Sequence, residues 1–215
     1  MIIAEPMTLL TDFALAGVTA GLGWYLYRAQ EGQATRAFWT AAFAALALSA
    51  ALGGIYHGFA PTLTAGARQF LWKATVLAVG IATFGMVAGS SIGTTTGTLR
   101  KLILAVAVSI LVVYSGWMIW HDSYVYVIAN AAIAMLLVGA MHGLTALRDA
   151  DHASRWMLAG VVVSVIAAGV QAGGFTLHRN FNHNDLYHVI QIAAMSLLYV
   201  GARQLRDRCS PERIQ

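Results

Sequence analysis

Long apolar stretches alternate with short polar segments along almost the whole chain. Each stretch is about as long as a helix must be to cross the hydrocarbon core of a bilayer. Because lipid cannot satisfy free backbone N–H and C=O groups, each stretch is predicted to be an α-helix. The pattern therefore predicts an all-α integral membrane protein, a bundle of seven transmembrane helices. The spans lie at about 8–27, 37–59, 69–89, 99–120, 123–147, 154–174 and 184–204.

The polar breaks between the spans are too short to hold a soluble domain. Residues 1–215 are therefore predicted to form a single transmembrane domain. The shortest break, the "HDS" of His121 to Ser123, predicts that the fourth and fifth spans form a close antiparallel hairpin. Glycines four residues apart are predicted to bring helices close together within the monomer, with a homodimer or a protein partner as the alternative. These pairs are Gly17/Gly21, Gly85/Gly89, Gly139/Gly143 and Gly169/Gly173.

Composition and charge support a membrane protein and set its orientation. Only 10% of the residues are charged, against about 25% in soluble domains. The net charge of +4 does not indicate nucleic-acid binding, because the basic residues lie in short loops and in the C-terminal tail. Ten of the thirteen Lys and Arg residues fall on one predicted side, which places the N-terminus outside and the C-terminus inside. The expected location is the plasma membrane of a bacterium. The ten residues are Arg28, Arg36, Arg100, Lys101, Arg148, Arg155, Arg203, Arg206, Arg208 and Arg213.

Most of the histidines gather at the predicted outer face. Five of the seven lie there, and His57 and His188 fall inside apolar spans. An ionisable group at membrane depth costs about 2.5–3.5 kcal/mol on insertion scales, so it normally faces the protein interior and has a partner. These two histidines are therefore the strongest candidates for a functional site.

Two imidazoles with a carboxylate or water form the usual catalytic zinc set. The predicted metal ligands are His57 and His188, with one or two of Asp185, His183 and Asn184. A bound zinc ion would supply a water acidic enough to attack an ester or amide.

Three residues are assigned catalytic roles around this site. Lys73 is predicted to stabilise an oxyanion, and Asp185 or Asp12 to serve as the base. Lys73 has an equally good structural interpretation, in which its ammonium reaches toward the headgroups. Asp12 is alternatively a helix cap or an ion-pair partner of Lys73.

The stretch "FNHNDLYH" also has an interpretation that needs no chemistry. Asn182 followed by Asp185 is typical of a helix N-cap and its returning acid. At about 100° per residue, His183 points about 140° away from His188. His183 is therefore a weaker candidate ligand than His188.

The arrangement resembles the superfamily of alkaline ceramidases and adiponectin-receptor-like proteins. The resemblance rests on "GGIYH", which places His57 late in the second span, and on "NDLYH", which places His188 in the seventh. It implies a seven-helix membrane hydrolase with a zinc ion held by three histidines. Two of the family's five signature residues match. Gly53 and Asn184 stand where the family has Ser and His, and the start of the third span has no acid.

The sequence therefore predicts a zinc-dependent hydrolase of a lipid amide or ester. Its lipid substrate would enter laterally from the membrane and be cleaved near the outer leaflet. Two alternatives stay open: a non-enzymatic membrane sensor or accessory subunit of a membrane complex, and a haem protein with His57 and His188 as axial ligands.

Overall fold

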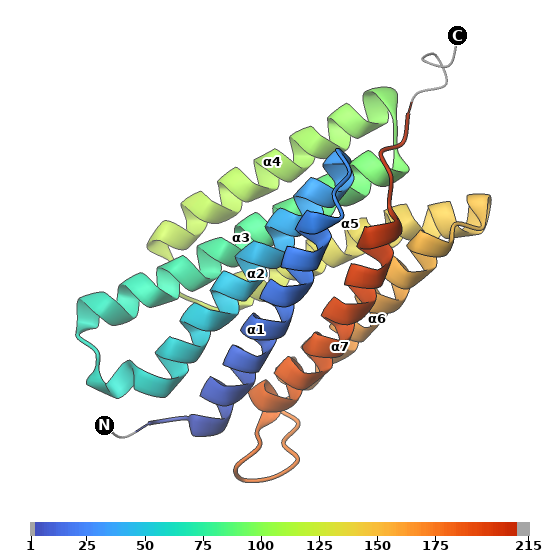
Figure 1. The fold of residues 1–215 in the computed structure, drawn as a ribbon. Coiled ribbons are helices and arrows are strands. Elements are labelled where there is room, and N and C mark those ends of the chain that lie inside the picture. Colours follow the sequence, from blue (N-terminus) through green and yellow to red (C-terminus); the bar gives the residue numbers. More distant parts are fainter. Residues whose placement is uncertain (1–2, 210–215) are drawn as a thin grey trace.

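The computed structural model describes residues 3–209, which fold into seven α-helices and one short 3₁₀ helix (Figure 1). All seven α-helices are long and apolar enough to cross a membrane. The predicted all-α architecture with seven long apolar helices is thus confirmed, and the third helix is longer at both ends than expected. The elements are α1 (Pro6–Arg28), α2 (Ala34–Phe59), η1 (Ala60–Thr62), α3 (Ala65–Thr94), α4 (Gly97–Trp120), α5 (Val125–Asp149), α6 (His152–Ala172) and α7 (His183–Gln204).

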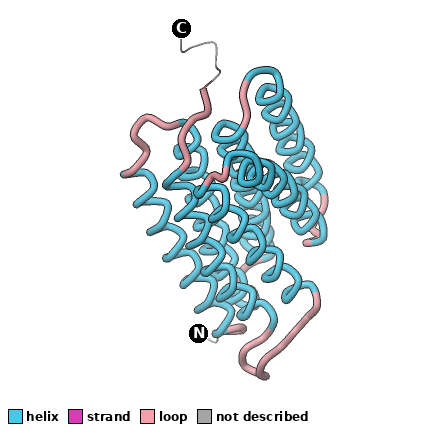
Figure 2. Tube along the Cα trace, turned by 90° about the vertical axis from the view of Figure 1, so that its right-hand side faces the viewer, coloured by secondary structure: helices cyan, strands magenta, loops and turns pink. Residues whose placement is uncertain are grey.

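Six of the helices form a closed ring, and the seventh lies outside it. Around the ring, α1 packs on α2, α2 on α3, α3 on α5, α5 on α6, α6 on α7, and α7 on α1. Helix α4 packs mainly on α3 and lies at one edge of the bundle (Figures 1 and 2). The first and last helices are therefore neighbours, and the interior of the ring is the place where a site can be enclosed.

The expected hairpin between the fourth and fifth spans is wrong. Helix α5 packs against α3 and α6 and makes few contacts with α4. The reason is a buried polar group on α5. Asn130 is 5% exposed, and its Nδ2 donates to Thr83 Oγ1 of α3 at 2.9 Å. An amide buried at this depth needs a partner, and it finds one on α3 and not on α4.

Close packing of α2 against α3 depends on one of the predicted glycine pairs. A Cβ added at Gly85 would lie 2.9 Å from Phe38 O, and one at Gly89 would lie 2.6 Å from Trp39 Cδ1. Contacts this short leave no room for a side chain at Gly85 or Gly89, so the backbone of α3 lies directly against α2, as small residues allow. By contrast, a Cβ at Gly17 or Gly169 would meet nothing within 4 Å.

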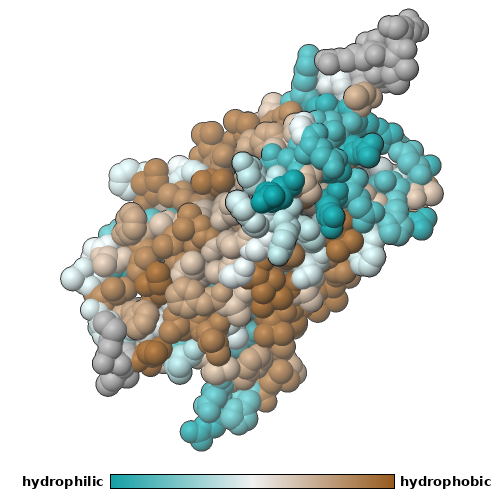
Figure 3. All heavy atoms as spheres, viewed as in Figure 1, coloured by the Kyte–Doolittle hydropathy of each residue, from teal (hydrophilic) through white to brown (hydrophobic). Residues whose placement is uncertain are grey.

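The segment after α7 folds back over one end of the bundle. Asp207 accepts hydrogen bonds from the backbone N–H of Ala34 (2.9 Å) and of Thr35 (2.8 Å), so it caps α2, whose own N-cap residue provides no side-chain bond. Arg208 forms an ion pair with Asp149 at the end of α5 (2.9 Å). Figure 3 shows hydrophilic residues concentrated at this end and hydrophobic ones across the middle of the face that it draws.

Candidate functional site

A cavity of about 260 Å³ lies inside the helix ring, toward the end where α1 and α7 begin. All six ring helices, or the residues directly before them, contribute to its wall, and α4 contributes none. Its titratable lining side chains are two histidines, one aspartate and three tyrosines. They are Asp12, Tyr56, His57, Tyr124, Tyr187 and His188.

Two glycines of α2 make room for Asp12 of α1. A Cβ at Gly54 would lie 2.9 Å from Asp12 Cβ, and a Cβ at Gly53 would lie 3.7 Å from Asp12 Oδ1. The sequence predicts that glycines one turn before His57 admit another group close to the imidazole. The group that packs there is Asp12, whose Cβ occupies the space that a side chain at Gly54 would need.

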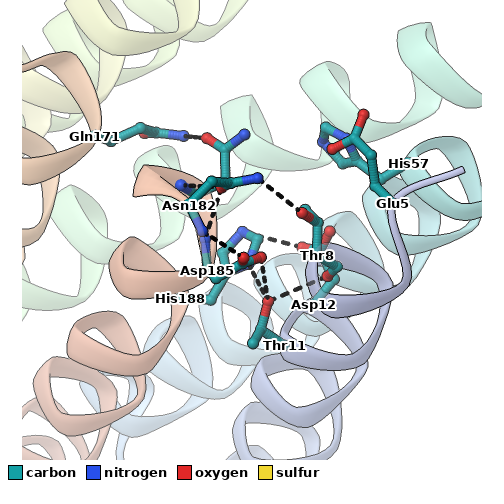
Figure 4. Close-up of polar contacts among 10 residues, drawn as sticks. Glu5, Thr8, Thr11, Asp12, His57, Gln171, Asn182, Asp185 and His188 are labelled. Atoms are coloured by element: carbon teal, nitrogen blue, oxygen red, sulfur yellow. Dashed lines mark hydrogen bonds and ion pairs between the residues drawn. The ribbon is translucent and has the colours of Figure 1, made fainter. Parts of the chain in front are cut away.

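His188 is held at both ring nitrogens by residues of α1. Its Nδ1 lies 3.0 Å from Thr11 Oγ1, and its Nε2 lies 3.2 Å from Asp12 Oδ1 (Figure 4). Both Asp12 and His188 are buried, at 4% and 7% exposed. Thr11 and Asp12 are consecutive residues of α1, and His188 belongs to α7. A single imidazole therefore connects the first helix to the last.

His57 is held by a carboxylate from the segment before α1. Its Nδ1 lies 3.2 Å from Glu5 Oε2 (Figure 4). The backbone N–H of Ala4 also donates to Gly58 O at 3.0 Å, which fixes this segment against the end of α2. Since Nδ1 faces Glu5, Nε2 is the nitrogen of His57 that is available to the cavity.

Asp185 has a structural role beside the cavity. Together with Asn182 it forms the predicted capping box: its Oδ2 accepts from Asn182 N at 2.8 Å, while Asn182 Oδ1 accepts from Asp185 N at 3.3 Å. The Asp185 carboxylate also accepts from Thr11 Oγ1 at 3.4 Å. The cap is therefore confirmed, and Asp185 supports His188 through Thr11 without lining the cavity.

The other residues suggested by the sequence are divided between the cavity and its surroundings. Asn184 lines the cavity, and its Oδ1 accepts from Gln171 Nε2 at 3.2 Å. His183 is half-buried at the first position of α7 and is not part of the wall.

Lys73 lies outside the cavity and closes the end of α4. Its Nζ donates to Met118 O at 2.7 Å and to His121 O at 3.0 Å, and pairs with Asp122 Oδ1 at 2.6 Å. Carbonyls at a helix C-terminus lack intrahelical donors and favour a cation. The ammonium is thus committed to α4 and does not face the two histidines or Asp12.

The side chains that the structure describes in the cavity wall are of types that bind metals, but they are not arranged as a metal-binding group. Within residues 3–209, no three His, Cys, Asp or Glu side chains are arranged as a metal-binding group. Two imidazoles and a carboxylate nevertheless converge on the cavity, which is a donor set that zinc accepts. The Oδ2 atom of Asp12 is buried without a hydrogen-bond partner, so this carboxylate has an unused acceptor at the cavity.

The sequence offered Asp12 as a candidate base but did not show that it contacts His188. The visible signal was an acid one turn inside an apolar span. The missing information was the packing of α1 between α2 and α7, which places Asp12, His57 and His188 in the wall of one cavity.

These features define a seven-helix bundle in which six helices enclose a cavity. The cavity has Asp12, His57 and His188 in its wall and is named the polar cavity. The chain belongs to DUF6962, a family of unknown function, whose family model matches residues 7–207. Comparison with curated proteins and with solved structures found no match. A function can therefore be inferred only from the site itself.

Proposed function

We propose that this protein is an integral membrane hydrolase that cleaves an amide or ester bond of a lipid. The observation that carries the proposal is that two neighbouring cavities share part of their walls. The polar cavity shares lining residues with a larger, apolar cavity of about 620 Å³ between α3, α5, α6 and α7. The shared residues are Leu46, Val79, Tyr124, Gln171, Tyr187 and Gln191.

The two cavities together suit an amphiphile. The larger one is lined mostly by aliphatic side chains such as Val127, Met135 and Val161, which suit an acyl chain. The smaller one would place the bond next to the chain beside Asp12, His57 and His188. A lipid entering laterally from the membrane would not have to cross a polar surface.

Zinc is the metal that this donor set favours, and Asp12, His57 and His188 would hold it. When bound, zinc supplies a water acidic enough to attack an amide or ester. The chain's own residues orient the ligands. Glu5 holds His57 at Nδ1 and Thr11 holds His188 at Nδ1, so a metal would be bound through Nε2 of each imidazole, which in His188 now contacts Asp12. Partners of this kind, on the second nitrogen, fix the tautomer and orientation of metal-binding histidines.

We further propose that the protein lies in the plasma membrane of a bacterium, with its N-terminus outside and its C-terminus inside. The strong bias of Lys and Arg supports this orientation. The hydrophilic end that carries the C-terminal segment would then face the cytoplasm (Figure 3). The histidine-lined cavity, at the opposite end, would lie near the outer leaflet.

Metal content and lipid hydrolysis test the proposal together. Protein purified without chelators is expected to contain about one zinc per chain by elemental mass spectrometry, and to release fatty acid from an acylated lipid. Asp12→Asn, His57→Ala and His188→Ala should each lose most of the metal. His183→Ala is the matched control, because His183 lies on α7 outside the cavity wall. Wild-type protein that is folded, metal-free and inactive would exclude the hydrolase.

A non-enzymatic lipid-binding protein is the second candidate. It is favoured by the contacts of His188, whose ring nitrogens already have partners in Thr11 and Asp12. This candidate predicts that a lipid copurifies with the protein while no metal and no hydrolysis are detected. Native mass spectrometry would reveal the bound lipid. A Soret band in the absorption spectrum of the same sample would indicate haem instead.

A further inference from the structure

Three aromatic side chains from different parts of the chain gather at the wall of the polar cavity. Trp72 of α3 lies between Tyr56 of α2 and Tyr124, with ring centroids 5.8 Å and 6.0 Å apart. The rings are tilted to one another by 47° and 51° and do not stack face to face. All three line the cavity. Several aromatic faces around a small space are how proteins bind ammonium groups.

Unpartnered polar atoms are concentrated in the same wall. Among residues 3–209, five buried side-chain N or O atoms have no hydrogen-bond partner, and four of them belong to residues that line this cavity. A buried polar group without a partner costs about 1–3 kcal/mol. Their concentration in one place leaves free acceptors on the aspartate and the two threonines, whereas the Trp72 N–H is a donor that an ammonium group does not satisfy. The four are Asp12 Oδ2, Thr19 Oγ1, Trp72 Nε1 and Thr75 Oγ1.

The charge around the cavity favours a cation. Asp12 lines the wall, and Glu5 and Asp185 lie behind the two histidines, with Asp185 reaching His188 through Thr11. Among residues 3–209, no Lys or Arg lines the cavity, and Lys73, next to Trp72 in the chain, is paired with Asp122. The site therefore has three carboxyl groups in or beside its wall and no basic side chain to oppose a cation. A phosphate headgroup would find no cation here.

We infer that the cavity recognises a lipid through a positively charged ammonium headgroup held by the rings of Tyr56, Trp72 and Tyr124. Asp12 Oδ2, which is buried without a hydrogen-bond partner, is an acceptor in the same cavity wall. The inference rests on the proposed lipid-binding function and names the class of its ligand: a single-chain lipid with an ammonium headgroup and no phosphate. It depends neither on a bound metal nor on turnover.

Matched single-chain probes test the headgroup directly. Binding of tetradecyltrimethylammonium, tetradecanol and tetradecyl phosphate to the full chain would be titrated in neutral maltoside micelles and measured by native mass spectrometry. The ammonium probe is expected to bind roughly 10-fold or more tightly than the alcohol, and the phosphate more weakly than both. This range corresponds to one or two cation–π contacts together with a nearby carboxylate.

Variants of the aromatic rings separate recognition from folding. Trp72→Leu and Tyr124→Leu should each weaken the ammonium probe by roughly 5- to 30-fold and leave tetradecanol unchanged. Trp72→Phe, which keeps a ring, should retain most of the preference for ammonium. The control is Trp117→Leu, since Trp117 is 47% exposed on α4 and lies outside the cavity.

Two results would overturn the inference. One is equal affinity of the wild type for the ammonium and alcohol probes. The other is an equal loss of both probes in Trp72→Leu and Tyr124→Leu, which would show that the rings serve only to pack the chain. Because the readout is binding, absence of zinc or of hydrolysis would remove the hydrolase and leave this result standing. Conversely, an active zinc enzyme without an ammonium preference would remove only the inference.

Discussion

Asp12 Oδ1 of α1 lies 3.2 Å from His188 Nε2 of α7, so a buried carboxylate and an imidazole join the first helix of the chain to the last. The contact closes the helix ring and at the same time forms one wall of the polar cavity. A group buried at this depth needs a partner, and here each residue is the other's. The same pair therefore contributes both to the stability of the fold and to the candidate site. Variants have to be tested for both effects.

Gly54→Ala tests whether the fit between α1 and α2 positions Asp12. The added methyl group would lie 2.9 Å from Asp12 Cβ, so one helix must shift. Overpacking of this kind costs about 1–3 kcal/mol, and zinc content should fall with it. Thermal unfolding in detergent and elemental analysis would measure both effects. Gly17→Ala is the control, because its methyl group would meet nothing within 4 Å; an equal loss in the two variants would contradict the prediction.

Thr11→Val tests the support of His188. The substitution keeps the shape of the side chain but removes the hydroxyl that contacts His188 Nδ1 at 3.0 Å and Asp185 Oδ1 at 3.4 Å. The buried imidazole then lacks a partner at Nδ1, which should cost about 1–3 kcal/mol. Loss of such an outer partner typically lowers metal affinity about 10- to 100-fold. Competition with a zinc chelator would measure the affinity, and Thr11→Ser should restore it.

Lys73→Met separates stability from function at a residue that the sequence placed in the site. Three contacts of its ammonium at the end of α4 would be lost. Hydrogen bonds to a charged group contribute about 1.5–3 kcal/mol when buried, and this side chain is 18% exposed. We therefore expect about 1 kcal/mol or more of destabilisation with unchanged zinc content. A zinc-free but fully stable variant would show instead that Lys73 acts at the cavity.

Asp207→Ala tests the capping of α2 by the C-terminal segment. The variant removes both hydrogen bonds to the backbone N–H groups of Ala34 and Thr35. Loss of an N-cap costs about 0.5–2 kcal/mol, so the midpoint of thermal unfolding should fall. Arg203→Ala, at an exposed site near the end of α7, should leave the midpoint unchanged. Because Asp207 lies far from the cavity wall, probe binding should also stay the same.

Local features of the sequence determined the helices and one of their caps. The seven helices follow from runs of apolar residues long enough to span a bilayer, because each helix satisfies its own backbone groups. The capping box at α7 was equally predictable, since Asn182 and Asp185 are only three residues apart. That His57 and His188 would have polar partners could also be expected, because an imidazole inside an apolar span is costly without one.

Only the tertiary structure decided which helices are neighbours and which side chains meet. Asp12 reaches His188 because α7 packs beside α1, and it fits there because two glycines of α2 leave space. Helix α4 lies outside the ring although a short break precedes α5, since the Asn130 amide finds its partner on α3. These outcomes depend on contacts between residues far apart in the chain. Apolar periodicity encodes the length of a helix and its tendency to enter a membrane, whereas its neighbours are selected by small residues and buried polar pairs that become complementary only in three dimensions.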